Sequence, residues 1–199
     1  MTDEHRASVM PTFELETPRL HVRLAEGGDV PAILNFYRAN RERFRPFDPE
    51  RPEYFYKESF WLRQVSENVE DFASGRNLRL FLFPREAPST IIGNIGFSNF
   101  VRGIGQYCTV GYAIDGEHES RGLMSEALRS AIDFVFHSLN LHRIEANYMP
   151  HNRRSGILLR RLGFVVEGYS RDYLRINGRW EDHVRSGLTN PDWIAPLPD

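Results

Sequence analysis

The sequence predicts an α/β fold: a single domain on a mixed, mostly antiparallel sheet of about seven strands, with helices on both faces. Three observations support this prediction. Short runs of alternating apolar and polar residues occur between segments of helical periodicity. The chain has 199 residues, which is enough for one sizeable core and short for two domains. Its composition, 41% apolar and 13% aromatic, is that of a soluble globular protein.

The first part of the chain predicts a strand followed by two helices. Alternating polarity marks the strand, and Asp29 with Pro31, at a tolerated first-turn position, opens the first helix. Residues 1–12 are polar and aperiodic, so we expect a disordered tail there and a domain over residues 13–199. The predicted elements are a strand at 20–24, a helix at 29–40, a proline-punctuated loop at 45–52 and an aromatic-rich helix at 56–74.

The rest of the chain completes the order β-αα-βββ-α-β-α-ββ. Short polar turns at 85–89 and 102–105 separate three antiparallel strands. The dipeptide Asn177-Gly178 is a strong signal for a type I′ hairpin. The predicted elements are strands at 79–83, 91–101 and 106–114, a helix at 122–139, a strand at 143–149, a helix at 152–162 and a strand pair from 164 onward.

The polar loop between the strand at 106–114 and the next helix is a candidate anion site. The loop ends at Gly122, where the absence of a Cβ lets a phosphate approach the main chain. Successive backbone N–H groups and a helix N-terminus then point at one place. The alternative is an ordinary strand-to-helix connection, because a single glycine loop is a weak indicator.

Two segments, residues 114–127 and 147–164, together resemble the motifs of the GNAT superfamily of N-acetyltransferases. Both follow a strand, and they stand in the family's order and spacing. The longer match, from Asn147 to Gly163, resembles the branch of ribosomal-protein-alanine N-acetyltransferases of the RimJ type. The resemblance covers roughly residues 15–193. It implies the GNAT fold and acetyl-CoA as the cosubstrate.

The resemblance also implies where acetyl-CoA binds. In the family, the pantetheine arm binds the main chain of a strand that splays from its parallel partner, and the pyrophosphate binds amides at the next helix. Gly111 independently suggests a bulge or a close backbone approach in that strand. Glu119 departs from the superfamily pattern, and its carboxylate lowers phosphate affinity unless it turns outward and Arg121 and the helix dipole compensate. The predicted cofactor-binding residues are Tyr112, Ala113, Ile114, Glu119, Ser120, Arg121, Gly122, Leu123, Met124, Asn152 and Ser155.

Ser155 is also the predicted catalytic residue at the thiol. The superfamily's common tyrosine acid is absent, because Leu159 occupies its place by count. Related ribosomal-protein acetylases have a serine near the thiol, and Ser155 stands at that position. Its hydroxyl would stabilise the departing thiolate. The alternative is that Asn152 caps the helix and Ser155 is a plain first-turn residue.

The sequence leaves the general base open. A sister branch uses a glutamate on the sixth strand, but Leu174 occupies that position here. We predict Glu145, which projects from the expected partner strand, with Asp172, Asp182 or a water relay as alternatives. For each carboxylate the structural alternative is a salt bridge to one of the many arginines.

Composition argues against several other functions. One cysteine, Cys108, excludes an internal disulfide, and the histidines lack ligand spacing, so no metal is expected. The chain start lacks signal-peptide features and no long apolar run occurs, which predicts a cytoplasmic protein without membrane contact. A net charge of −2 does not favour nucleic-acid binding. The oligomeric state stays open.

The function expected from the resemblance is transfer of the acetyl group of acetyl-CoA to the N-terminal alanine amine of a protein, by direct attack in a ternary complex. The implied acceptor is a protein of the small ribosomal subunit. Two alternatives remain. One is an acetylase of a small amine or antibiotic on the same fold, and the other is a ribosome-assembly or binding factor that needs no catalysis.

Overall fold

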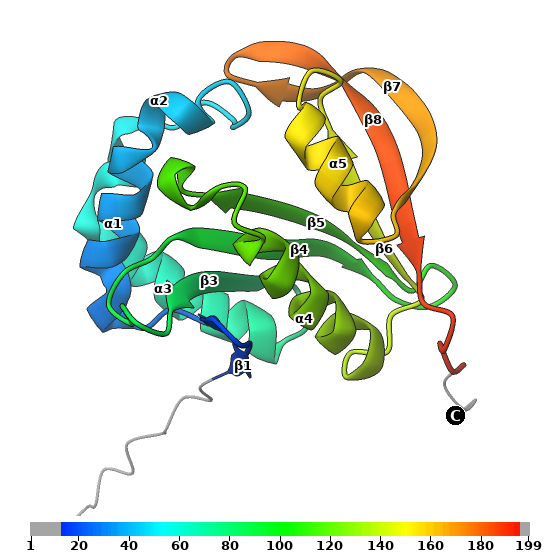
Figure 1. Cartoon of the computed structure of the whole chain (residues 1–199), viewed down its shortest axis with the longest axis horizontal. Coiled ribbons are helices and arrows are strands. Elements are labelled where there is room, and N and C mark those ends of the chain that lie inside the picture. The colour runs from blue at the N-terminus through cyan, green and yellow to red at the C-terminus, as the bar shows by residue number, and fades with distance from the viewer. Residues whose placement is uncertain (1–12, 196–199) are drawn as a thin grey trace, which may run out of the picture.

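The computed structural model describes residues 13–195, and its strands form one sheet in the order β1-β2-β3-β4-β5-β6-β8-β7 (Figure 1). The tail expected at residues 1–12 lies outside the described residues. The sheet has eight strands where the sequence predicts about seven, because a three-residue strand is too short to show alternation. The strands are β1 Glu14–Glu16, β2 Leu20–Arg23, β3 Leu78–Pro84, β4 Gly93–Val101, β5 Tyr107–Ile114, β6 Arg143–Tyr148, β7 Val165–Ile176 and β8 Arg179–Thr189.

The helices agree with the predicted ones except around residue 45. A four-residue helix, α2, ends at Phe44, and the chain then enters the predicted proline loop. A 3-10 turn, Glu53–Tyr56, precedes the aromatic helix, which therefore begins at Glu58 and not at Tyr56. The helices are α1 Val30–Ala39, α2 Arg41–Phe44, α3 Glu58–Ala73, α4 Leu123–His137 and α5 Arg153–Arg161.

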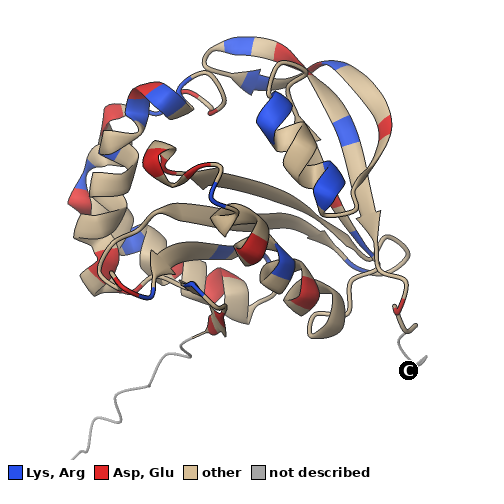
Figure 2. Ribbon diagram, in the orientation of Figure 1, with Lys and Arg blue, Asp and Glu red and all other residues tan. Residues whose placement is uncertain are grey.

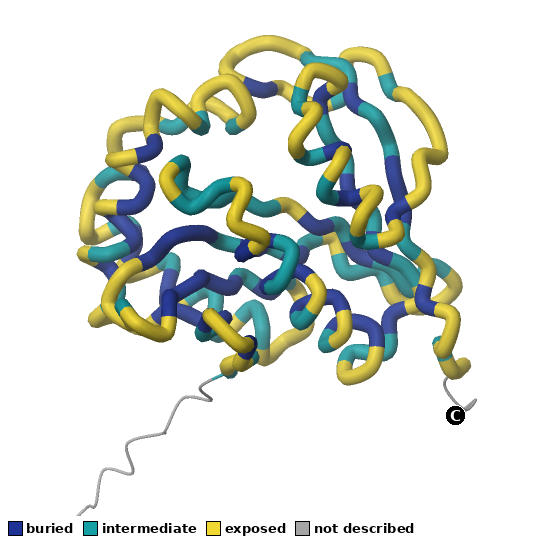
Figure 3. Tube along the Cα trace, in the orientation of Figure 1, coloured by how far each residue is buried: buried dark blue, intermediate teal, exposed yellow. Residues whose placement is uncertain are grey.

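Helices cover both faces of the sheet, as predicted, and β3 shows how the two faces are divided. Leu80 and Leu82 belong to the core cluster that includes the apolar residues of α4. Phe81 and Phe83 point the other way, into the cluster formed by α1 and α3 around Trp61. All five of these side chains are fully buried, and the central strands lie along the buried middle of the fold (Figure 3).

The only parallel strand pair in the described sheet, β5 and β6, comes apart partway along its length. Residues Tyr107 to Thr109 pair with residues Arg143 to Glu145, but β5 then continues to Ile114 without a β6 partner. Gly111 does not form the suggested bulge: it pairs in register with Gly96, and the bulge of this strand pair lies opposite, after Ser98. The separation opens a gap at the end of the sheet where α4 and α5 begin.

The last hairpin closes that end of the molecule. Asn177 and Gly178 both have positive φ, 44° and 80°, as a type I′ turn requires. The tip of the hairpin contacts the loop after α2, because the Asn177 amide donates to the Asp48 carbonyl at 2.9 Å. The loop at residues 44–52 and the hairpin β7–β8 therefore meet across the gap between β5 and β6.

Candidate active site

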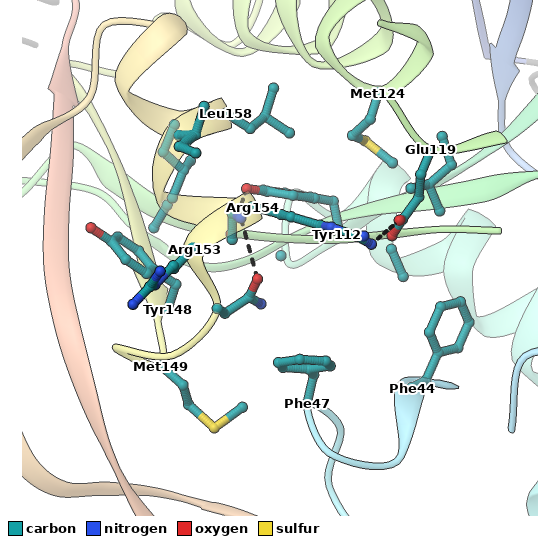
Figure 4. Close-up of a pocket in the computed structure, with 18 of the residues that line it drawn as sticks. Phe44, Phe47, Tyr112, Glu119, Met124, Tyr148, Met149, Arg153, Arg154 and Leu158 are labelled. Atoms are coloured by element: carbon teal, nitrogen blue, oxygen red, sulfur yellow. Dashed lines mark hydrogen bonds and ion pairs between the residues drawn. The ribbon is translucent and has the colours of Figure 1, made fainter. Parts of the chain in front are cut away.

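A cleft of about 1220 Å³ opens where β5 and β6 separate. Its floor is β5 from Val110 to Ile114, and the starts of α4 and α5 form one wall. The loop after α2 and the end of β6 form the other wall. Figure 4 shows Phe44 and Phe47 on one side of the cleft and Leu158 of α5 on the opposite side.

The loop before α4 presents unpaired backbone donors to this cleft. Within the part of the chain that the structure describes, the amides of residues 120–125 donate to no acceptor. Ser120 and Gly122 both have positive φ, 58° and 79°, and Gly122 is the N-cap of α4. A chain bent in this way turns consecutive amides toward one concave point, at the positive end of a 15-residue helix. Main-chain donors in this arrangement suit an anion, and the residues present are compatible with a pyrophosphate.

Glu119, the unexpected carboxylate of this loop, is neutralised by two arginines from opposite walls. Its side chain forms ion pairs with Arg43 of α2 and with Arg154 of α5. In Figure 2, basic segments of α2 and α5 lie on either side of the acidic segment that follows β5. The sequence expected Arg121 to compensate, but Arg121 does not line the cleft. Arg43 and Arg154 supply the positive charge in its place.

A second ion pair fixes the loop from behind. Arg19 donates to the Arg121 carbonyl at 2.9 Å and pairs with Glu126 of α4 at 2.7 Å. Burial would raise the pKa of Glu126, but hydrogen bonds from Thr17 and Arg19 hold it below its ordinary value. Glu126 is therefore ionised at neutral pH, and it ties β2 to the first turn of the helix that carries the anion site.

Ser155 lies in the cleft and forms a pair with Tyr112. The two hydroxyl oxygens are 2.7 Å apart, and either can be the donor. Burial raises the pKa of Tyr112 to about 12, so the phenol stays protonated at neutral pH. The Asn152 side chain accepts the Ser155 amide at 3.2 Å and caps α5. The cap that the sequence offered as an alternative role is present, and it positions Ser155 beside a tyrosine from β5.

The opposite wall consists of side chains from distant parts of the chain. Phe44 and Phe47 come from α2 and its loop, Met149 and His151 follow β6, and His183 comes from β8. The rings of Phe47 and His151 lie 5.8 Å apart. None of these residues was predicted for the site. Met149 and His151 lie within the second motif segment but were given no role, and Phe44, Phe47 and His183 belong to no motif and are brought to the cleft by the topology of the fold.

The acidic residues proposed as the base lie elsewhere. Glu145 pairs with Arg143 at 3.2 Å and with Arg185 at 3.1 Å and does not line the cleft. Asp182 accepts the Tyr169 hydroxyl at 2.6 Å and the Asp172 amide at 2.9 Å on the exposed hairpin. The Tyr169 hydrogen bond holds the pKa of Asp182 below its usual value. The salt-bridge alternative therefore accounts for Glu145, Asp182 is held by hydrogen bonds and not by an arginine, and Asp172 and Asp182 lie off the cleft.

The remaining predicted residues come together in the cleft. Among the cofactor-binding set only Arg121 is outside its lining. In the described residues, no three histidine, cysteine or acidic side chains group as metal ligands. No described helix is long and apolar enough to cross a membrane. The ten predicted lining residues are Tyr112, Ala113, Ile114, Glu119, Ser120, Gly122, Leu123, Met124, Asn152 and Ser155.

Comparison with known proteins assigns this architecture to a family. A family model described as the acetyltransferase (GNAT) domain matches residues 19–165. The chain belongs to the GNAT acetyltransferase family. It is 43% identical over 186 residues to the ribosomal protein uS5-alanine N-acetyltransferase of Escherichia coli, covering 94% of this chain and 95% of that relative.

Solved GNAT structures share the whole fold. The ribosomal-protein-S5-alanine acetyltransferase of Vibrio fischeri superposes with a TM-score of 0.86 and 34% identity, covering 93% of this chain and all of that one (100%). Mycobacterium smegmatis RimJ, solved in complex with CoA-disulfide, gives a TM-score of 0.80 at 24% identity, covering 89% of this chain and 86% of that one. The latter similarity is one of fold. The resemblance predicted from the two motifs is thus confirmed across the sheet and its helices.

Proposed function

We propose that this GNAT enzyme transfers the acetyl group of acetyl-CoA to the N-terminal alanine of a small-subunit ribosomal protein. The observation that carries the proposal is the 43% identity to the Escherichia coli uS5-alanine N-acetyltransferase across 94% of this chain. The cleft supports it, because one wall fits a phosphorylated thioester and the other is open to an acceptor. A ribosomal acceptor would place the reaction in the cytoplasm.

The main chain around β5 and α4 would hold the cosubstrate. The unpaired amides of residues 120–125 would bind the pyrophosphate, and the free edge of β5 would take the pantetheine arm. Arg154, freed in part from Glu119, would add positive charge at the phosphates. Acetyl-CoA itself supplies an acyl carbon activated by its thioester. A free amide of β5 beside the acetyl carbonyl would need no rearrangement as negative charge develops on the carbonyl oxygen, which favours the transition state.

Ser155 and Tyr112 would assist the departure of the thiolate. The Ser155 hydroxyl donates toward the sulfur while the Tyr112 hydroxyl donates to Ser155 at 2.7 Å. A chain of two hydroxyl groups polarises the outer one and strengthens its hydrogen bond to a developing anion. Because its pKa is about 12, Tyr112 keeps its proton and acts as a donor throughout the neutral range.

The acceptor chemistry favours an N-terminal amine over a lysine. An α-amine with a pKa near 7.7–8.0 costs about 1 kcal/mol to neutralise at pH 7, whereas a lysine near 10.4 costs roughly 4.6 kcal/mol. No carboxylate predicted as the base lines the cleft. A cleft that lacks each of the predicted carboxylate bases suits the α-amine, which is the less basic of the two amines and the easier to neutralise. The spermidine N(1)-acetyltransferase of Vibrio cholerae, at 25% identity, keeps a small-amine acceptor as the second candidate.

Intact-mass analysis of small-subunit ribosomal proteins from cells with and without this enzyme tests the proposal. We expect one protein to lose 42 Da, the mass of one acetyl group, when the gene is deleted, and to regain it on complementation. Complementation with Ser155→Ala is the matched control and should restore little of the modification. An unchanged set of ribosomal masses would contradict the proposal and direct attention to small amines.

A further inference from the structure

One imidazole is buried in the wall of the cleft that includes Phe44, Phe47, Met149 and His151, which we call the acceptor wall. His183 lies near the start of β8, is only 4% exposed and contributes to the lining of the cleft. Its ring lies 5.6 Å from that of Tyr173 in an edge-on arrangement, and this packing helps to fix the orientation of the imidazole. No role is assigned to it by the main-chain site or by the Ser155–Tyr112 pair.

The hydrogen bond of His183 determines which of its nitrogens carries the proton. Nδ1 lies 2.9 Å from the Glu181 carbonyl oxygen. A carbonyl oxygen can only accept a hydrogen bond, so Nδ1 must donate. In the neutral ring the lone pair is then on Nε2, which is the arrangement that a general base requires.

Nε2 is left free to act. Within the residues that the structure describes, every fully buried side-chain nitrogen or oxygen has a hydrogen-bond partner. Nε2 of His183 has no hydrogen-bond partner among them, so it is not fully buried, and the residue to which it belongs lines the cleft. It is an unpaired nitrogen on a residue that lines the cleft.

The charged groups around His183 are mostly engaged elsewhere. On β8, Asp182 accepts from Tyr169, and Arg185 pairs with Glu145 of β6 while stacking on Tyr173 of β7. Across the cleft, Asp48 pairs with Arg51, and Glu119 binds two arginines. The other histidine, tyrosine and acidic residues that line this cleft or the adjoining pocket beside the hairpin tip are Glu42, Tyr112, His118, Tyr148, His151, Glu50 and Glu181; of these, Glu42 pairs with Arg45 and His118 with Asp115.

We propose that His183 is the general base of the reaction, an inference that rests on the proposed function. Nε2 takes a proton from the acceptor ammonium, directly or through one water. The neutral amine attacks the thioester carbon, a C–N bond forms, and the C–S bond breaks as the nitrogen loses its second proton, which reaches the departing sulfur through solvent or the Ser155 hydroxyl to give the free thiol. The thiolate leaves with hydrogen-bond support from Ser155, and the imidazolium returns its proton to solvent. No oxidant, reductant or metal is needed.

The test is the pH dependence of turnover for His183→Asn, with an alanine-initiated peptide as the acceptor. The asparagine amide can still donate to the Glu181 carbonyl, but it cannot accept a proton at the position of Nε2. We expect kcat to fall at least about tenfold at pH 6.5 and by less than about threefold at pH 9, where the acceptor amine with its pKa near 8 is already neutral. The control is His137→Asn, an exposed histidine of α4 outside the cleft lining, and it should leave the profile of the wild type.

Each outcome decides the matter. A thermal shift with acetyl-CoA first establishes that His183→Asn is folded, and His183→Gln replaces it if the shift is lost. Recovery of turnover in His183→Gly on addition of imidazole supports the proposal. An unchanged kcat, a loss equal at all pH values, or the same alkaline shift in His137→Asn overturns it and leaves the proposed function standing. If the wild type prefers another amine, the profile is measured with that amine; a wild type that acetylates no amine overturns both proposals.

Discussion

The two walls of the cleft are built from different material. The cosubstrate wall consists of consecutive main-chain amides at residues 120–125, a free strand edge and a capped helix. The acceptor wall consists of aromatic, thioether and imidazole side chains from three separate parts of the chain. The proposed main-chain site would bind the cosubstrate that this acetyltransferase family uses. A side-chain wall can change its acceptor by substitution without disturbing that site.

The largest effect that this comparison predicts is at the thiol. Ser155→Ala should lower kcat by ten- to a thousandfold, because its hydrogen bond strengthens only as charge develops on sulfur. The acetyl-CoA KM should change by less than about threefold. A steady-state assay of free thiol release at varied acetyl-CoA concentration provides both kcat and KM. Loss of stability with little loss of rate would make Ser155 a structural first-turn residue.

Tyr112→Phe probes the second hydroxyl of the same pair. We expect a smaller loss of kcat than for Ser155→Ala. The double variant should lose less activation free energy than the two single variants together, because both hydroxyl groups act through one hydrogen bond. Since the pKa of Tyr112 is raised to about 12, its proton is lost only as pH rises toward that value. The wild-type rate should therefore show no alkaline decline from this group below about pH 11. A decline near pH 9 that Tyr112→Phe abolishes would contradict the pair as described.

Gly122→Val tests the main-chain wall. The new Cβ would stand where the pyrophosphate approaches, so the acetyl-CoA KM should rise at least tenfold, or about 1.4 kcal/mol. Gly122 also has φ 79°, so the substitution strains the backbone, at a cost of about 1–3 kcal/mol in stability. Gly75→Val is the control: φ is 67°, the Cβ space is open, and the site is remote from the cleft lining. Both variants should lose stability, but only Gly122→Val should raise the KM. Equal effects of the two substitutions on KM would mean that the pyrophosphate does not bind at this loop.

Glu119→Gln should tighten acetyl-CoA binding. Removing the carboxylate releases Arg43 and Arg154 and takes a negative charge away from the phosphates. We expect Kd to fall by about three- to tenfold, or roughly 0.6–1.4 kcal/mol, by calorimetry at low salt. The control is Glu117→Gln in the same loop, which should have no such effect. Weaker binding in Glu119→Gln would mean that the carboxylate orders the two arginines for the cosubstrate.

The smallest expected effect is at Glu145. Its two arginine partners lie away from the cleft, so Glu145→Gln should leave kcat within about twofold of wild type at pH 7. The pH–rate profile, measured beside that of His183→Asn, checks this. An alkaline shift in Glu145→Gln would restore the carboxylate that the sequence suggested as the base.

More of the cosubstrate wall than of the acceptor wall could be predicted from local sequence. Gly122, Asn152 and the Asn177-Gly178 turn each set a backbone geometry that few other residues can adopt, so their positions predict a helix start, a cap and a hairpin. The strand β1 and helix α2 are too short for periodicity to detect. Phe47 and His183 line one cleft, and the hydrogen bond between the hairpin tip and the loop after α2 holds their two segments in contact. Their spacing along the chain carries no sign of that contact.

The dependence on contacts between distant segments also explains why the prediction that Arg121 compensates Glu119 was wrong. A carboxylate at residue 119 is unfavourable when judged from its own loop, where Arg121 is the nearest compensating residue. Its actual partners, Arg43 and Arg154, are 76 and 35 residues away in sequence, by subtraction of the residue numbers. Interactions of this kind depend on the assembled fold and not on a motif.

The central claim is that this GNAT fold acetylates an N-terminal alanine and not a lysine. Tandem mass spectrometry of one peptide that carries both an N-terminal alanine and an internal lysine tests it most directly. After incubation with acetyl-CoA and the enzyme, we predict the acetyl group on the α-amine, with the lysine unmodified and no product in the absence of enzyme. Acetylation of the lysine side chain, or of spermidine in preference to the peptide, would contradict the claim.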